Sequence, residues 1–335
     1  MSGLSGGPNI KNRSSDDFHP HRHMSVQDCA LVELGEVLRD RSYRFTTVTP
    51  ATHARFIEAA SRGAQGLRDV FGWSLPFHRS VIPSRIFSLM RDAEVLRPAG
   101  ETWRSTVRFS HLNNHLLAHS AYPTTAGDAV FFGPDTYRFC NFIQAFLDAG
   151  TAPLGRAVDI GCGSGAGAIL IASARAAAEV LAVDINDEAL RLTRINAALA
   201  GLSNVHPQHS NLLQDVDGEF DLIVANPPYL IDADQRAYRH GGGVLGAELS
   251  LAMLDAALPR LALGGTLLLY TGVAMIDGED PFLREVQKRV HGARMHAHYR
   301  ELDPDVFGEE IGHGAYAHAD RIAAVGLQVT RNARA

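Results

Sequence analysis

The chain has 335 residues, enough for one large domain or two, and its 46% hydrophobic and 20% charged residues are typical of a globular protein. No run of 18 apolar residues occurs, which excludes a membrane-spanning helix. The three cysteines are widely spaced without a Cys-x-x-Cys pair, which argues against a disulfide framework or a zinc finger. The first 150 residues carry 16 basic and 14 acidic side chains and the remainder 15 and 23, so the totals indicate no strongly basic nucleic-acid-binding surface. Because the N-terminus also lacks an apolar signal core, we expect a cytoplasmic protein that makes no contact with a membrane.

Residues 1–24 are polar and rich in glycine, serine and histidine, so we expect a disordered tail. Three histidines alternate along it (His19, His21 and His23). We interpret them as part of a flexible tail and predict no metal site in this protein.

Residues 25–97 are predicted to form a small helical domain. Apolar residues recur there at helical spacing, and the expected helices cover residues 26–41, 50–63, 65–71 and 83–96. No chemistry is visible in this region, which we interpret as packing against the rest of the chain and positioning a substrate.

Residues 98–150 are predicted to form a linker. Residues 102–110 and 116–122 alternate and contain β-formers on either side of a polar turn, which indicates a β-hairpin. A helix that runs to Leu147 is expected to follow and to lead into the next domain.

Residues 151–335 alternate between strands and helices, the pattern of a doubly wound α/β sheet. The strands are expected at residues 156–160, 179–184, 203–208, 220–225, 265–271, 293–301 and 321–330. The helices are expected at residues 166–177, 187–200, 247–262 and 281–290. The last two strands would form an antiparallel hairpin that ends an otherwise parallel sheet.

A glycine-rich turn follows the first of these strands. Asp159 stands at the strand end, and Gly161, Gly163 and Gly165 follow it before the helix begins. The glycines allow a ligand to approach the backbone closely, and Asp184 at the end of the next strand can accept hydrogen bonds from a ribose diol. Taken alone, this pattern also satisfies the fingerprint of a dinucleotide-binding protein.

A second motif, the tetrad Asn226-Pro227-Pro228-Tyr229, follows the strand 220–225. Each proline fixes its own φ and restricts the residue before it, so the asparagine is held extended and rigid where the strand ends.

Together these motifs resemble those of class I S-adenosylmethionine (SAM) methyltransferases. The Asp-x-Gly-x-Gly-x-Gly turn is similar to their first motif, and the tetrad is similar to the catalytic motif of enzymes that methylate planar nitrogens. The catalytic part, roughly residues 98–330, resembles the HemK/PrmC-type release-factor glutamine methyltransferases and their relatives in the "methyltransferase small domain" group. The shared features also include the helical region before it, the hairpin and the segment 132–137. The resemblance implies a seven-stranded Rossmann-like sheet, SAM as cofactor and methyl transfer as the reaction.

The resemblance also implies roles for individual residues on the cofactor side. The glycine turn would lie along the methionine part of SAM, and Asp159 would lie near the ammonium group. Asp184 would bind the ribose hydroxyls, and Ile185 would contact the adenine face. The residues expected to bind SAM are Asp159, Gly161, Cys162, Gly163, Gly165, Asp184, Ile185, Asn211, Leu212 and Asn226.

On the acceptor side, the tetrad is expected to be catalytic. The Asn226 side-chain oxygen and the Pro227 carbonyl could accept the two N–H groups of an amide or amine and draw charge toward its nitrogen, and Tyr229 would stack on the planar group. This scheme requires no general base.

The acceptor itself stays open between a glutamine-type amide of a protein and the exocyclic amine of a nucleobase. Gly133 and Tyr137 stand where the glutamine enzymes carry an arginine and an acid, which puts a release-factor substrate in question. A small-molecule acceptor is an alternative. From other classes, the alternatives are a nicotinamide-dependent oxidoreductase and a SAM-binding module without activity.

Overall fold

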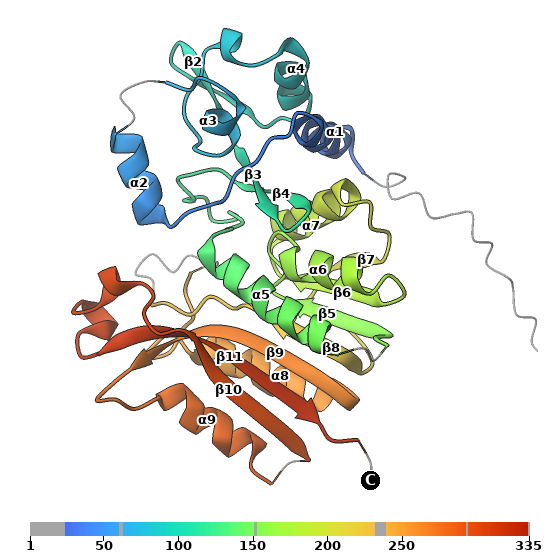
Figure 1. Ribbon diagram of the computed structural model, residues 1–335, viewed down its shortest axis with the longest axis vertical. Helices are drawn as coiled ribbons and strands as arrows, with labels where there is room; N and C mark the ends of the chain where they lie inside the picture. Colours follow the sequence, from blue (N-terminus) through green and yellow to red (C-terminus); the bar gives the residue numbers. More distant parts are fainter. Residues whose placement is uncertain (1–23, 60–62, 151–152, 232–238, 293, 334–335) are drawn as a thin grey trace, which may run out of the picture.

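The computed structural model describes residues 24–59, 63–150, 153–231, 239–292 and 294–333 (Figure 1). Apart from Met24, the predicted tail with its histidines lies outside these ranges. In the described part of the chain, no helix has the length and apolar character needed to span a membrane.

In its described residues, the N-terminal region contains four α-helices at one end of the molecule (Figure 1). They are α1 (Val26–Asp40), α2 (Pro50–Ala59), α3 (Leu67–Phe71) and α4 (Ser84–Asp92). The last of these ends four residues earlier than expected. Glu94, just after it, has a φ of +58°, a left-handed conformation that cannot continue a helix.

Two hairpins, not one, follow these helices. The strand expected over residues 102–110 is divided, because the Ser105 hydroxyl bonds to both the carbonyl and the N–H of Val107 and interrupts the ladder. The resulting strands are β1 (Leu96–Ala99), which pairs with β2 (Thr102–Ser105), and β3 (Val107–Leu112), which pairs with β4 (His115–Ser120).

The remaining strands form one seven-stranded sheet in the order β10-β11-β9-β8-β5-β6-β7. They are β5 (Arg156–Ile160), β6 (Glu179–Asp184), β7 (Val205–His209), β8 (Phe220–Ala225), β9 (Leu261–Met275), β10 (Met295–Asp303) and β11 (Arg321–Arg331). The pairs among β5 to β9 are parallel, and β11 runs antiparallel to both β9 and β10. This confirms the predicted doubly wound, Rossmann-like sheet with an antiparallel hairpin at its end.

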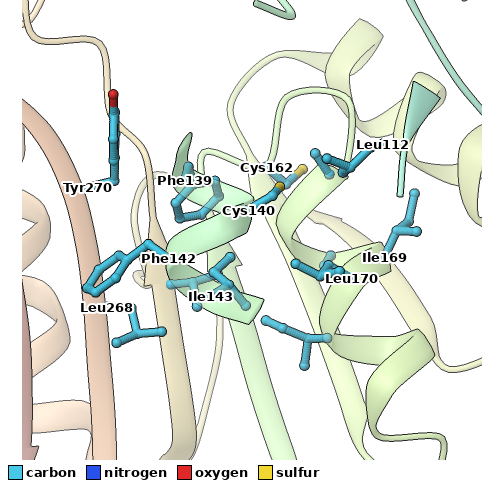
Figure 2. Close-up of a cluster of buried hydrophobic side chains, with 14 of the residues drawn as sticks. Leu112, Phe139, Cys140, Phe142, Ile143, Cys162, Ile169, Leu170, Leu268 and Tyr270 are labelled. Atoms are coloured by element: carbon cyan, nitrogen blue, oxygen red, sulfur yellow. The ribbon is translucent and has the colours of Figure 1, made fainter. Parts of the chain in front are cut away.

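Helices cover both faces of this sheet, which explains why its central strands are apolar throughout. The helices are α5 (Pro134–Ala149), α6 (Ala166–Ala174), α7 (Asp187–Leu199), α8 (Glu248–Ala257) and α9 (Pro281–Val290). Side chains of α5 and α6 belong to one core cluster, and those of α8 and α9 belong to another. Figure 2 shows the first cluster, in which Phe142 and Ile143 of α5 lie between Leu268 of β9 and Leu170 of α6.

The N-terminal region and the sheet domain share a core through α7. Its apolar residues cluster with those of α1 to α4 and of the β3–β4 hairpin. The fully buried Asn196 on the same helix holds the hairpin at both backbone groups of Ala118: its Oδ1 accepts from the N–H at 2.7 Å, and its Nδ2 donates to the carbonyl at 2.9 Å. The domain boundaries at residues 24, 97 and 150 remain predictions.

Candidate active site

The carboxyl ends of β5, β6 and β8 open into one cavity of about 440 Å³. Ligands of open α/β sheets bind at this edge. The predicted site residues that line the cavity are Asp159, Gly161, Cys162, Gly163, Asp184, Ile185, Asn211, Leu212, Asn226, Pro227, Pro228 and Tyr229. The fold therefore brings the glycine turn and the tetrad to a single space, although more than 60 residues separate them in sequence.

The glycine turn needs glycine for its backbone conformation. Gly161, Gly163 and Gly165 have φ values of +69°, +54° and +78°, which other residues rarely adopt. Gly165 is the predicted residue that does not line the cavity. A Cβ on it would lie 2.8 Å from Thr193 Cγ2, so its role is to let the turn pack closely against α7.

Asp184 joins the turn to the end of β6. Its Oδ2 accepts the N–H of Gly163 at 3.0 Å and its Oδ1 accepts that of Asn186 at 2.9 Å. Burial raises the pKa of its carboxyl in spite of these bonds. The adjacent Ile185 has a side chain that is 60% exposed and lines the cavity, an apolar surface suited to a flat ring.

Asp159 is buried inside the sheet edge, with 2% of its surface exposed. Its Oδ2 accepts the backbone N–H of Ala168 at 2.9 Å and so connects β5 to α6. Burial, followed by the nearby charge of Asp184, raises the pKa of Asp159 to about 7. The carboxyl of Asp159 therefore changes between its neutral and its negatively charged form near neutral pH.

Asn226 follows β8 and is partly exposed to the cavity. Within the described residues, its carboxamide makes no hydrogen bond. Its neighbour Pro227 is buried, so the turn that carries the carboxamide is fixed while the carboxamide is available to a ligand.

Tyr229 is 6% exposed and is anchored by a residue that the sequence did not single out. Its hydroxyl donates to Asp135 Oδ2 at 2.8 Å, and the Tyr270 hydroxyl donates to Asp135 Oδ1 at 2.5 Å. Asp135 belongs to the segment 132–137 at the start of α5. This segment is one of the features that carry the family resemblance, so the sequence pointed to the segment but not to this residue. Burial, together with the charge of Asp135, raises the pKa of Tyr229 well above its usual value, so its hydroxyl keeps its proton.

The N-terminal region and the β3–β4 hairpin also line the cavity. Val48, Pro50 and His53 come from the start of α2 and the segment before it, and Arg108 comes from β3. These positions are compatible with the expected role of the helical region in positioning a substrate, which stays a prediction. As for metals, no cluster of three or more His, Cys, Asp or Glu side chains suited to an ion occurs in the described ranges.

Comparison with known proteins identifies the family. A family model described as the methyltransferase small domain matches residues 142–275. A release factor glutamine methyltransferase from Deinococcus radiodurans is 33% identical over 204 residues, which are 56% of this chain and 72% of that protein. A ribosomal protein uL3 glutamine methyltransferase from Bordetella pertussis is 36% identical over 149 residues, which are 39% of this chain and 50% of that protein.

Among solved structures, a ribosomal protein L11 methylase from Lactobacillus delbrueckii subsp. bulgaricus is similar with a TM-score of 0.41 and 23% identity, covering 58% of this chain and 80% of that one. From the family model and the relative from Deinococcus, the chain belongs to the methyltransferase small domain family, which includes release factor glutamine methyltransferases, and it is a SAM-dependent methyltransferase.

Proposed function

We propose that this enzyme transfers a methyl group from SAM to a planar nitrogen, and that Asn226 holds that nitrogen. The observation that carries the proposal is the carboxamide of Asn226, which has no hydrogen-bond partner among the described residues and lines the same cavity as the glycine turn and Asp184. The oxidoreductase alternative does not hold, because the chain belongs to a methyltransferase family.

The residues of the cavity fit SAM. A Cβ on Gly163 would meet only Val130, at 4.0 Å, so the turn leaves room for a ligand against its backbone. Asp184 offers carboxylate oxygens to a ribose diol, and Ile185 offers an apolar face to adenine. When bound, SAM supplies a methyl group on a positively charged sulfur.

The chain's own residues would orient the acceptor. The Asn226 side-chain oxygen and the Pro227 carbonyl accept its two N–H groups, which draws electron density toward the nitrogen as it becomes positive. Alignment of two reactants in this way can lower a barrier by about 7–11 kcal/mol. Methyl transfer would release S-adenosylhomocysteine and leave a positively charged nitrogen, which would give its proton to water, so the scheme needs no general base. The anchored ring of Tyr229 is left to contact the planar group.

The acceptor we propose is a glutamine-type amide of a protein or the exocyclic amine of a nucleobase. The names of the relatives from Deinococcus and Bordetella favour the amide. A low-molecular-weight acceptor is the second candidate. It is favoured by the extension of the cavity into the N-terminal region, where Val48, Pro50 and Tyr122 form largely apolar walls.

The test uses two reciprocal substitutions. The purified protein is incubated with methyl-labelled SAM and three acceptor pools: glutamine-containing peptides, nucleosides with RNA, and low-molecular-weight metabolites. We expect labelled N-methyl product from the wild type and none from Asn226→Ala, with binding of S-adenosylhomocysteine within a few-fold of the wild type by calorimetry. Asp184→Ala should instead weaken cofactor binding. Methylation of oxygen or carbon, or an active Asn226→Ala, would contradict the proposal.

A further inference from the structure

A buried arginine lines the N-terminal part of the active-site cavity. Arg108, on β3, is only 2% exposed, and His53, Tyr122, Val48 and Pro50 line the cavity with it. Its side chain belongs to none of the cofactor or tetrad contacts described above.

Among the described residues, the hydrogen bonds of Arg108 are to uncharged groups. Its Nε donates to the Ser120 carbonyl at 3.2 Å, and its Nη1 lies 3.4 Å from His53 Nδ1. Over the described ranges, Arg108 forms no ion pair, and its Nη2 makes no hydrogen bond. By contrast, Arg239, which also lines the cavity, is paired with Glu310.

His53 does not share or neutralise this charge. Its Nε2 lies 2.9 Å from the Trp73 carbonyl, which can only accept, so Nε2 carries the proton and Nδ1 is left to accept from Arg108. Burial, followed by the charge of Arg108, lowers the pKa of His53 to about 4. Burial lowers the pKa of Arg108 only to about 10, so at neutral pH the two side chains carry one positive charge.

A charge removed from water needs a counter-ion or a full set of hydrogen bonds, and Arg108 has neither within the described chain. A guanidinium presents its N–H groups in a planar fork that matches the oxygens of a carboxylate or phosphate. The walls beside it are Val48, Pro50, Tyr122 and Phe131, which suit the apolar body of a ligand.

We propose that Arg108 binds an oxyanion group, a carboxylate or a phosphate, of a low-molecular-weight methyl acceptor whose nitrogen lies at Asn226. This inference rests on the proposed function and selects its second candidate, the low-molecular-weight acceptor, over the protein amide and the nucleobase amine. The enclosure of Arg108 favours a small acceptor, because a polymer would have to insert a side chain or a nucleotide through the cavity to reach a residue that is only 2% exposed.

The test measures binding of three probes to the protein saturated with S-adenosylhomocysteine: benzoate, phenyl phosphate and the neutral benzamide. We expect the wild type to bind one or both anions about tenfold or more tightly than benzamide, since a hydrogen bond to a charged group is worth more than that factor. Preference between benzoate and phenyl phosphate distinguishes the two oxyanions. This comparison needs no variant and so does not depend on how a substitution affects folding.

Arg108→Gln should then lose the preference for the anions, and Arg108→Lys should keep part of it. The matched control is Arg97→Met, which removes an equal charge from the exposed strand β1 and should bind all three probes as the wild type does. Equal binding of benzoate and benzamide by the wild type would overturn the inference, as would a folded Arg108→Gln that keeps the preference. Binding of RNA or a glutamine peptide that is lost in Arg108→Gln, with no binding of the small anions, would assign the site to a polymer and also overturn it. Failure of the wild type to bind S-adenosylhomocysteine would instead count against the proposed function.

Discussion

Asp159 combines a buried position with a pKa near neutrality. Because its pKa is raised to about 7, it is largely protonated and neutral at pH 5.5 and carries more negative charge as the pH rises. We propose that Asp159 binds the ammonium group of SAM, as the family resemblance implies. The positive charge of that group would stabilise the carboxylate and lower the pKa of Asp159. Binding of SAM near pH 6.5 should therefore release a proton.

We predict that the affinity for SAM rises by about tenfold between pH 5.5 and 7, where an α-ammonium group stays largely protonated. Calorimetry in buffers of different ionisation enthalpy measures both the affinity and the released proton. Asp159→Asn should abolish the proton release and flatten the pH profile. A wild-type affinity that does not change with pH would refute the contact between Asp159 and the ammonium group.

At the scale of elements, the position of the tetrad depends on the neighbouring strand β9. A Cβ built on Gly272 would lie 2.1 Å from Tyr229 Cε2, so only glycine lets the tyrosine ring lie against the strand. The ring's hydroxyl is then held by Asp135 from α5. Two elements that are distant from each other in sequence, β9 and α5, thus fix the turn that carries the tetrad.

We predict that Gly272→Ala displaces the tyrosine ring and lowers turnover by about 100-fold, the effect of a shift on the order of 1 Å at a reacting centre. Binding of S-adenosylhomocysteine should stay within a few-fold, because the glycine turn is not touched. The comparison variant is Tyr229→Phe, which keeps the ring and removes only its hydrogen bond, and should lose less activity. Wild-type turnover in a folded Gly272→Ala would show that the ring position does not matter.

At the scale of the whole molecule, the N-terminal region is bound to the sheet domain by a continuous apolar core and by Asn196. Besides the two bonds to Ala118, the Nδ2 of Asn196 donates to the Ser164 carbonyl at 2.9 Å, in the glycine turn. One buried carboxamide therefore joins the hairpin that carries Arg108 to the turn proposed to bind SAM.

Asn196→Ala should lower the free energy of unfolding by about 2 kcal/mol or more, because it leaves several buried backbone groups without partners. Urea unfolding measures this loss. The control is Arg194→Ala, an exposed position on the same helix, which should change stability by less than about 0.5 kcal/mol. Equal stability of the two variants would mean that water or a rearranged hairpin satisfies these groups.

The sequence alone determined the doubly wound sheet, the glycine turn and the family resemblance, because each depends on a local pattern: apolar runs that end in Asp159, Asp184 and Asn226, positive-φ positions filled by glycine, and prolines that fix a turn. Even the strand bounds of the sheet differ from expectation by only a few residues, except for β9, which extends from Leu261 to Met275.

The tertiary structure decided which residues far apart in the chain contact one another, because no local sequence pattern contains that information. Asp135 resembles an ordinary residue in the first turn of a helix until Tyr229 and Tyr270 donate to it. Arg108 resembles a solvent-facing residue of an alternating strand until the chain folds His53 of α2 against it and buries it. Both depend on contacts between residues far apart in the chain, whose partners are chosen by packing rather than by sequence spacing. The same packing gives the active site its N-terminal wall, and with it the charge that we propose selects the acceptor.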